Sequence, residues 1–432
     1  MKKQKNSGDI SALGRVILFF REIGEKISEM RLLQRLIERQ KKAAGYTNAS
    51  SPEEAKLSFG FGVARVCAVS VLCLFLAVTL LFGGGIISYE NVYYMFKDIG
   101  YISSFTESRP DSLNYSRPVN NQDFSSFKNG LAVVGDNEIK FFTSTGRMTL
   151  TSGSDFSNPK ITCSDSLALI YDQGRHYFAV YNSFISVYSE TLRYPISSAH
   201  MAKDGSFCVV TRSERYGSVV RVYDKDFSLE SEYSKNDLVV SARMSDDGKH
   251  VAVLSFDTQA GEGVAKLSVL RRGSDERKGE AVVYDVMPYF VSFLTNDRIV
   301  AVCDGKAVVY GLDGNVKGSI DYPGALTFVS ETDGGFAMLF DEGSVRAESH
   351  LVILDRNGNV RRSEKIAGVV SDMKYHGNYV YMLCENEAVR LDVTLGARSR
   401  TPFAEEQATL LVFANGEVMA CTDATAYYLS FH

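Results

Sequence analysis

The sequence has no tryptophan and little proline, with 8 Pro among 432 residues. Glycine, in contrast, is frequent at 35 residues. A chain with many glycines and few prolines has many positions that allow tight turns and few rigid linkers. This balance favours a turn-rich β protein over a helical one.

The sequence also lacks the cysteine patterns of disulfide frameworks and zinc sites. Its seven cysteines include no C-x-x-C pair, and an odd set of scattered thiols indicates neither kind of site. Cys67 and Cys73 lie in an apolar run. Four others lie in apolar, strand-like runs, where free cysteine behaves as a small core residue, and we predict burial for them: Cys208, Cys303, Cys384 and Cys421.

Catalytic and cofactor-binding motifs are missing from the sequence. It has no G-x-S-x-G, P-loop or dinucleotide-binding pattern, and its six histidines form neither H-x-x-H nor H-E-x-x-H. Two S-x-x-K matches, Ser125 to Lys128 and Ser371 to Lys374, lack the companion motifs S-D-N and K-T-G of penicillin-recognising enzymes. We therefore predict no catalytic, cofactor-binding or metal-ligating residue and no cofactor, which favours a protein that is not an enzyme.

The segment DRNGN, from Asp355 to Asn359, resembles the start of a calcium loop. A complete loop needs glycine at its sixth position and glutamate at its twelfth, but Val360 and Ile366 stand there. The segment is better explained as a hairpin between two strands.

Charge divides unevenly along the chain. Residues 1–65 hold 13 Lys/Arg and 7 Asp/Glu, a net charge of +6, so the remainder holds 34 basic and 45 acidic residues, a net charge of −11. A basic arm suits anionic lipid headgroups. The acidic remainder argues against nucleic acid as a partner, because phosphate binding needs clustered Lys/Arg.

A run of 22 uncharged residues, 66–87, predicts one transmembrane helix. At 1.5 Å per residue it reaches about 33 Å, enough to cross a hydrocarbon core. Since the run begins after 65 residues and no A-x-A-like site follows, it indicates a signal anchor and not a cleaved signal peptide. The basic arm 1–60 then stays cytoplasmic, and the C-terminal part lies outside the cytoplasm.

Within the arm, residues 9–42 have apolar side chains spaced alternately by three and four positions, which predicts an amphipathic helix. Its apolar face could lie on the inner leaflet of the bilayer. It could equally self-associate or pair with a partner helix. A solvated helix without a special role is the third alternative.

After residue 118 a hairpin pattern recurs eight times. The copies align on Gly130, Ser166, Gly205, Gly248, Asp297, Gly334, Gly377 and Gly416, at intervals of 36, 39, 43, 49, 37, 43 and 39 residues. Six of the eight keep a glycine in the turn, where positive φ is expected. A period near 40 with four short strands per copy is typical of a β-propeller.

These copies predict an all-β fold, an eight-bladed propeller over residues 119–432. The last copy ends soon after its third strand, so we expect a ring-closing strand from residues 97–118, within a stalk that spans 88–118. The second copy has Asp-Ser at its turn, and without it the ring would have seven blades.

The repeat resembles the quinoprotein-like and WD-repeat-like propellers, and the anchor with a propeller resembles an uncharacterised family of membrane-anchored propeller proteins of Firmicutes. This resemblance covers residues 60–432 and implies no established activity. The absence of tryptophan departs from the tryptophan-rich docking pattern of the enzymatic quinoproteins.

Together these features predict a single-pass membrane protein whose propeller is a binding or scaffolding module at the cell envelope. Its expected partners are the lipid bilayer and a protein, peptide or glycan outside the cytoplasm. The polar excursion RRGSDERKGE, residues 271–280, is a candidate recognition loop or a solvated hairpin. The alternative function is a hydrolase or lyase acting on envelope polysaccharide, with acidic and histidine side chains meeting at the propeller channel.

Overall fold

The computed structural model describes residues 111–115 and 122–431, except 260, 275, 333–334, 344–347, 406 and 414, together with Val69 and Ser70. The chain forms two compact units, Met1–Phe105 and Thr106–His432. In the first unit Val69 and Ser70 are helical. The rest of the predicted span 66–87 and all of the predicted helix 9–42 lie outside the described residues.

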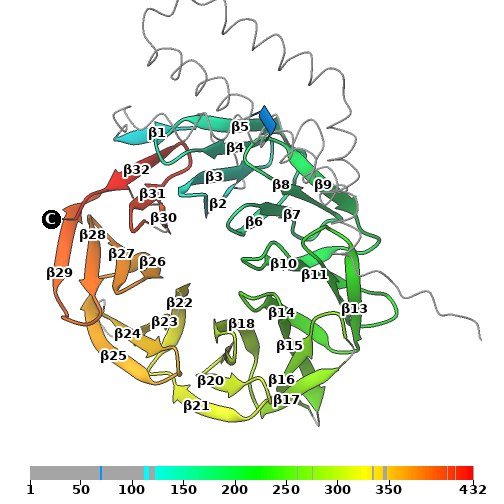
Figure 1. Cartoon of the computed structure of the whole chain (residues 1–432). Helices are drawn as coiled ribbons and strands as arrows, with labels where there is room; N and C mark the ends of the chain where they lie inside the picture. The colour runs from blue at the N-terminus through cyan, green and yellow to red at the C-terminus, as the bar shows by residue number, and fades with distance from the viewer. Residues whose placement is uncertain are drawn as a thin grey trace, which may run out of the picture. The chain divides into compact units, whose positions relative to one another are not determined.

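The second unit is built from eight antiparallel sheets of four strands each, arranged in a ring (Figure 1). The prediction of an eight-bladed β-propeller is therefore confirmed, and the seven-bladed alternative is wrong. Blades 1 to 4 comprise β2 (Gln122–Phe127), β3 (Gly130–Gly135), β4 (Glu138–Phe142) and β5 (Met148–Gly153); β6 (Pro159–Cys163), β7 (Ala168–Asp172), β8 (Tyr177–Tyr181) and β9 (Ser186–Thr191); β10 (Ile196–Met201), β11 (Phe207–Arg212), β12 (Ser218–Tyr223) and β13 (Leu229–Lys235); and β14 (Leu238–Met244), β15 (His250–Gln259), β16 (Glu262–Arg271) and β17 (Arg277–Tyr284).

The remaining blades follow the same order from the axis outward, and blade 8 takes its outermost strand from the start of the unit. Blades 5 to 8 comprise β18 (Pro288–Thr295), β19 (Arg298–Cys303), β20 (Lys306–Gly311) and β21 (Val316–Asp321); β22 (Ala325–Thr332), β23 (Gly335–Asp341), β24 (Glu348–Asp355) and β25 (Val360–Ala367); β26 (Val370–His376), β27 (Tyr379–Cys384), β28 (Glu387–Asp392) and β29 (Arg398–Pro402); and β30 (Thr409–Val412), β31 (Val418–Cys421), β32 (Thr425–Leu429) and β1 (Ser112–Asn114).

β1 pairs antiparallel with β32 and closes the ring. Leu113 lies opposite Ala426 in this pairing. The strand expected from residues 97–118 is thus β1, and both ends of the propeller meet in one blade. Closure of this kind removes the open sheet edges that a linear array of blades would leave.

The hydrophobic core lies between blades and not within any one of them. The second strand of a blade is buried along its length, as in β3 and β7, because it packs against neighbours on both faces. One apolar cluster fills each junction between successive blades. The cluster between blades 8 and 1 includes Leu113, Leu131, Phe142, Leu411 and Met419.

Two turns between first and second strands differ in detail from the expected Asn-Gly type. In blade 1, Lys128 and Asn129 take positive φ, and Gly130 is the first residue of β3. A side chain at Gly130 would overlap the carbonyl oxygen of Phe142. In blade 2 the Ser164 hydroxyl oxygen accepts the N–H of Leu167 at 3.0 Å, so a serine side chain organises the turn that lacks glycine.

Candidate functional site

The innermost strands surround the axis of the ring (Figure 1). Their side chains bond one blade to the next. At six of the eight junctions, a side chain of one innermost strand accepts a backbone N–H of the following one. The donor–acceptor pairs are Ile161 N to Asp123 at 2.9 Å, Met201 N to Thr162 at 3.4 Å, Met244 N to His200 at 3.2 Å, Val291 N to Ser241 at 3.4 Å, Tyr375 N to Ser330 at 2.8 Å and Leu410 N to Asp372 at 2.6 Å. The polar side chains on the axis are therefore held by the fold.

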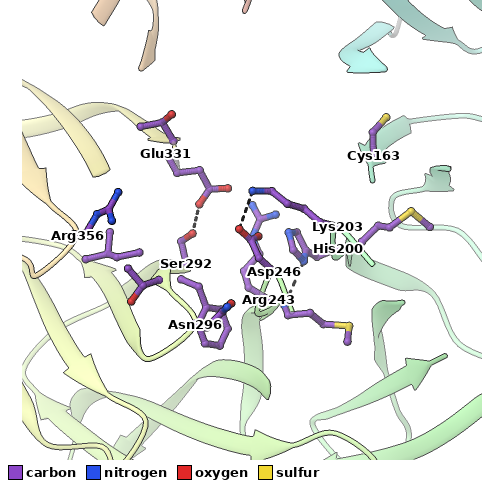
Figure 2. Close-up of a pocket in the computed structure, with 15 residues that line it drawn as sticks. Cys163, His200, Lys203, Arg243, Asp246, Ser292, Asn296, Glu331 and Arg356 are labelled. Atoms are coloured by element: carbon purple, nitrogen blue, oxygen red, sulfur yellow. Dashed lines mark hydrogen bonds and ion pairs between the residues drawn. The ribbon is translucent and has the colours of Figure 1, made fainter. Parts of the chain in front are cut away.

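A pocket of about 450 Å³ lies where β10, β14, β18 and β22 end, and we call it the axial pocket. Its lining combines polar residues of the innermost strands with residues of the adjacent turns (Figure 2). The residues that define it are His200, Lys203, Arg243, Asp246, Glu331 and Arg356. Its volume falls in the range of small-molecule sites.

His200 enters the axial pocket as a neutral hydrogen-bond donor. Burial, and then the nearby Arg243 guanidinium, lower the pKa of His200 well below its usual value. Its Nδ1 accepts the N–H of Met244 at 3.2 Å. A neutral imidazole that accepts at Nδ1 carries its proton on Nε2, so the ring presents an N–H group.

Two arginines of the axial pocket have no carboxylate within ion-pair distance among the described residues. The Arg243 guanidinium lies over the Phe290 ring, 4.8 Å from its centroid, in a cation–π contact. Arg356 is exposed and comes from the turn between β24 and β25. Neither guanidinium therefore forms an ion pair with a described carboxylate.

The carboxylates of the axial pocket are already bonded. Asp246 pairs with Lys203 at 2.8 Å. The Ser292 hydroxyl donates to Glu331 (Figure 2). Each carboxylate therefore has one partner in place and keeps further lone pairs for a ligand.

Arg356 of the DRNGN segment lines the axial pocket, but the other residues of that segment and the two S-x-x-K matches do not. Asp355 accepts the N–H groups of Asn357 at 2.8 Å and Asn359 at 2.9 Å, so the segment that resembles a calcium loop is a hairpin turn closed by its own aspartate. Ser371 and Lys374 both lie on the strand β26, and neither lines the axial pocket. No metal-binding cluster of His, Cys, Asp or Glu occurs among the described residues.

The excursion 271–280 is the hairpin that joins β16 to β17, and it lines a second pocket of about 470 Å³ with Glu230 and His250. Arg272 pairs with Asp204 at 3.2 Å and with Glu230 at 3.0 Å. Because Asp204 and Glu230 belong to blade 3, these ion pairs connect the hairpin of blade 4 to blade 3.

Other histidines lie away from the axial pocket. His350 bonds Glu342 through Nδ1 at 2.8 Å and Ser363 through Nε2 at 2.7 Å, on the outer strands of blade 6. This order of groups is that of a serine hydrolase triad. Here, however, Lys365 holds the other oxygen of Glu342 at 2.7 Å, which fits a surface network of charges.

The five cysteines among the described residues are free thiols. Cys208, Cys303 and Cys421 are buried, as predicted, whereas Cys384 is half-buried. Burial raises the pKa of Cys208 and of Cys303 to about 12.

The axial residues were not singled out in the sequence, although a signal for them exists. His200, Arg243 and Ser292 each stand five positions before the aligned turn residue of their copy, Gly205, Gly248 and Asp297. An alignment of the copies at the turn places these polar residues at one level of the ring. Glu331 and Arg356 follow no such register.

The ring of eight four-stranded sheets defines this protein as an eight-bladed β-propeller. The family model of the family of unknown function DUF5711 matches residues 107–422. The chain belongs to this family.

Comparison with one solved structure supports the same fold. The crystal structure of BamB from Moraxella catarrhalis is similar with a TM-score of 0.52 and 10% identity, over 74% of this chain and 99% of that one. A crystal structure of the eukaryotic initiation factor gives a TM-score of 0.46 and 12% identity, over 74% and 93%. The intraflagellar transport protein 172 homolog of Danio rerio is 31% identical over 106 residues, which are 24% of this chain and 6% of that protein.

Among the residues that the structure describes, no helix is long and apolar enough to cross a membrane.

Proposed function

We propose that this protein is a membrane-anchored, extracytoplasmic β-propeller that acts as a binding or scaffolding module at the cell envelope. The observation that carries the binding function is the axial pocket. There, the unpaired Arg243 and the N–H of His200 are positioned by successive blades. A rigid ring that presents unsatisfied donors is suited to recognition.

The anchoring part of the proposal rests on the uncharged run 66–87 and on the basic arm before it. Lys and Arg are retained on the cytoplasmic side of a membrane, which puts the propeller on the other side. We include in this proposal a relationship to the membrane-anchored propellers of Firmicutes. Its partners are the bilayer and an envelope protein, peptide or glycan, with self-association through the arm helix 9–42 as an addition.

An enzyme acting on envelope polysaccharide is the second candidate. The convergence of His200, Asp246 and Glu331 in the axial pocket favours it. Against it, Lys203 and Ser292 already hold the two carboxylates, whereas glycoside hydrolysis needs one carboxyl to give up a proton. Release of reducing ends from envelope polymer, abolished by Glu331→Gln, would establish the enzyme.

Location is tested by labelling engineered cysteines in cells stripped of their wall. Leu395 is 78% exposed, so Leu395→Cys gives a reporter on the propeller, and Ser7→Cys gives one on the arm. A membrane-impermeant maleimide should label the first in intact cells and the second only after permeabilisation. The reverse pattern would refute the proposed orientation.

A further inference from the structure

We propose that the axial pocket binds a sugar acid, a hydroxylated ligand that carries one carboxylate. This inference deepens the proposed function and rests on it. Net charge, the position of the donors and the supply of acceptors each support this ligand class, and they come from different residues of the pocket.

The charge of the axial pocket selects a monoanion. Lys203, Arg243 and Arg356 supply three positive charges, and Asp246 and Glu331 supply two negative ones, so the net charge is 3 − 2 = +1 with His200 neutral. One carboxylate balances this charge. A phosphate monoester, which carries about −1.5 to −2 at neutral pH, would leave excess negative charge beside the two carboxylates.

The unpaired donors fit the planar carboxylate group. A guanidinium binds carboxylate through two parallel N–H groups, and a cation–π contact with the Phe290 ring helps to hold Arg243 in place. Arg243 and His200 lie on the neighbouring strands β14 and β10 at the same level of the repeat. The Nε2–H of His200 therefore adds a third donor on the same side of the pocket.

Acceptors and small polar side chains also line the pocket. Glu331 and Asp246 keep lone pairs beyond their bonds to Ser292 and Lys203. Thr295 and Asn296 also line the pocket. Ligand hydroxyl groups donate to such carboxylates and exchange hydrogen bonds with hydroxyl and amide groups, which favours a sugar acid over an apolar carboxylate.

The test is titration calorimetry of the purified full-length protein with four probes: D-glucuronate, D-glucose, N-acetylglycine and inorganic phosphate. We expect glucuronate to bind most tightly and glucose not to bind. Arg243→Gln should weaken glucuronate binding about tenfold or more, since a charge-assisted hydrogen bond is lost. Arg243→Lys should restore only part of it, because lysine lacks the fork.

Arg356→Gln changes an exposed residue and so keeps the test valid if Arg243→Gln does not fold. It should also weaken binding. Arg400→Gln is the matched control, because Arg400 is 59% exposed on β29, pairs with Glu387 and does not line the axial pocket. The affinity of this variant for glucuronate should equal that of the unmodified protein.

Several results would overturn the inference. They are tighter binding of phosphate or N-acetylglycine than of glucuronate, equal binding of glucose, or unchanged affinity in both folded pocket variants. If no probe binds while crosslinking in native membranes still captures a partner, the sugar-acid site is wrong and the binding function stands. If neither is found, both fail.

Discussion

The Tyr115 hydroxyl donates a hydrogen bond to the carbonyl oxygen of Thr422, across 307 positions of the chain. Tyr115 N–H also donates to the Ala424 carbonyl at 3.1 Å, and the Lys140 ammonium donates to the Tyr115 carbonyl at 2.9 Å. Tyr115 thus joins blade 8 to blade 1 directly after β1. Ring closure depends on this residue as well as on strand pairing.

Tyr115→Phe should therefore lower the free energy of unfolding by about 1–2 kcal/mol, because one buried hydrogen bond is removed while ring packing is kept. The measurement is the urea midpoint at constant m-value. Tyr289→Phe is the control, since Tyr289 is 50% exposed, and it should have almost no effect. Equal midpoints for the two variants would show that Tyr115 does not secure closure.

The bonds between innermost strands should also contribute to stability. Ser330 is buried, and its hydroxyl oxygen accepts the Tyr375 N–H at 2.8 Å. Ser330→Ala leaves that N–H without a partner, and the expected loss is about 1–3 kcal/mol in the free energy of unfolding. Ser234→Ala, at an exposed position of β13, should be nearly neutral. A neutral Ser330→Ala would mean that this hydrogen bond does not stabilise the junction of blades 6 and 7.

Stability should depend on pH through His200. Its folded pKa is lowered by burial and by Arg243, so below the unfolded value of about 6.5 the unfolded chain binds a proton that the folded chain does not. Its contribution is thus present above about pH 6.5 and is lost as pH falls toward the folded pKa, with a slope of up to about 1.4 kcal/mol per pH unit.

Comparison with His200→Asn isolates this contribution, because asparagine keeps an acceptor for Met244 N–H but does not titrate. Urea midpoints between pH 5 and 7.5 should fall less steeply for the variant than for the unmodified protein. Parallel pH profiles would contradict the burial of a neutral His200.

The buried thiols should be inert in the folded protein. Thiolate is the reactive form, and burial raises the pKa of Cys208 and of Cys303 to about 12. Thiol titration at pH 8 should detect Cys208, Cys303 and Cys421 only after unfolding in urea, with peptide mapping to assign the modified residues. Rapid modification of any of the three before unfolding would show that its blade junction opens.

The repeat was predictable because each blade carries the same local signals: a tight turn, a buried second strand and a period near 40. The outcome at the second copy shows the limit of a glycine rule, since Ser164 replaces glycine by bonding Leu167 N–H. The closing strand could be expected from the incomplete last copy, but the contacts of Tyr115 could not, because their partners lie at the far end of the chain.

The axial pocket could not be predicted from sequence motifs, for a different reason. Its residues come from separate blades and are brought together by ring closure, so no local spacing joins His200 to Glu331 or Arg356. Among the described residues no carboxylate lies within ion-pair distance of Arg243, and this is likewise a property of its three-dimensional surroundings. A sequence pattern identifies charges but does not show which of them the fold leaves without partners.

We propose that a propeller outside the cytoplasm binds an envelope component at its axial pocket, and site-specific photo-crosslinking in intact cells tests this proposal. A photoreactive residue at Thr332 lies in the axial pocket, and one at Val316, which is 61% exposed on β21, serves as the matched control. The account predicts a reproducible envelope product from position 332 and none from position 316. Identical products from both positions, or a cytoplasmic product from position 332, would contradict it.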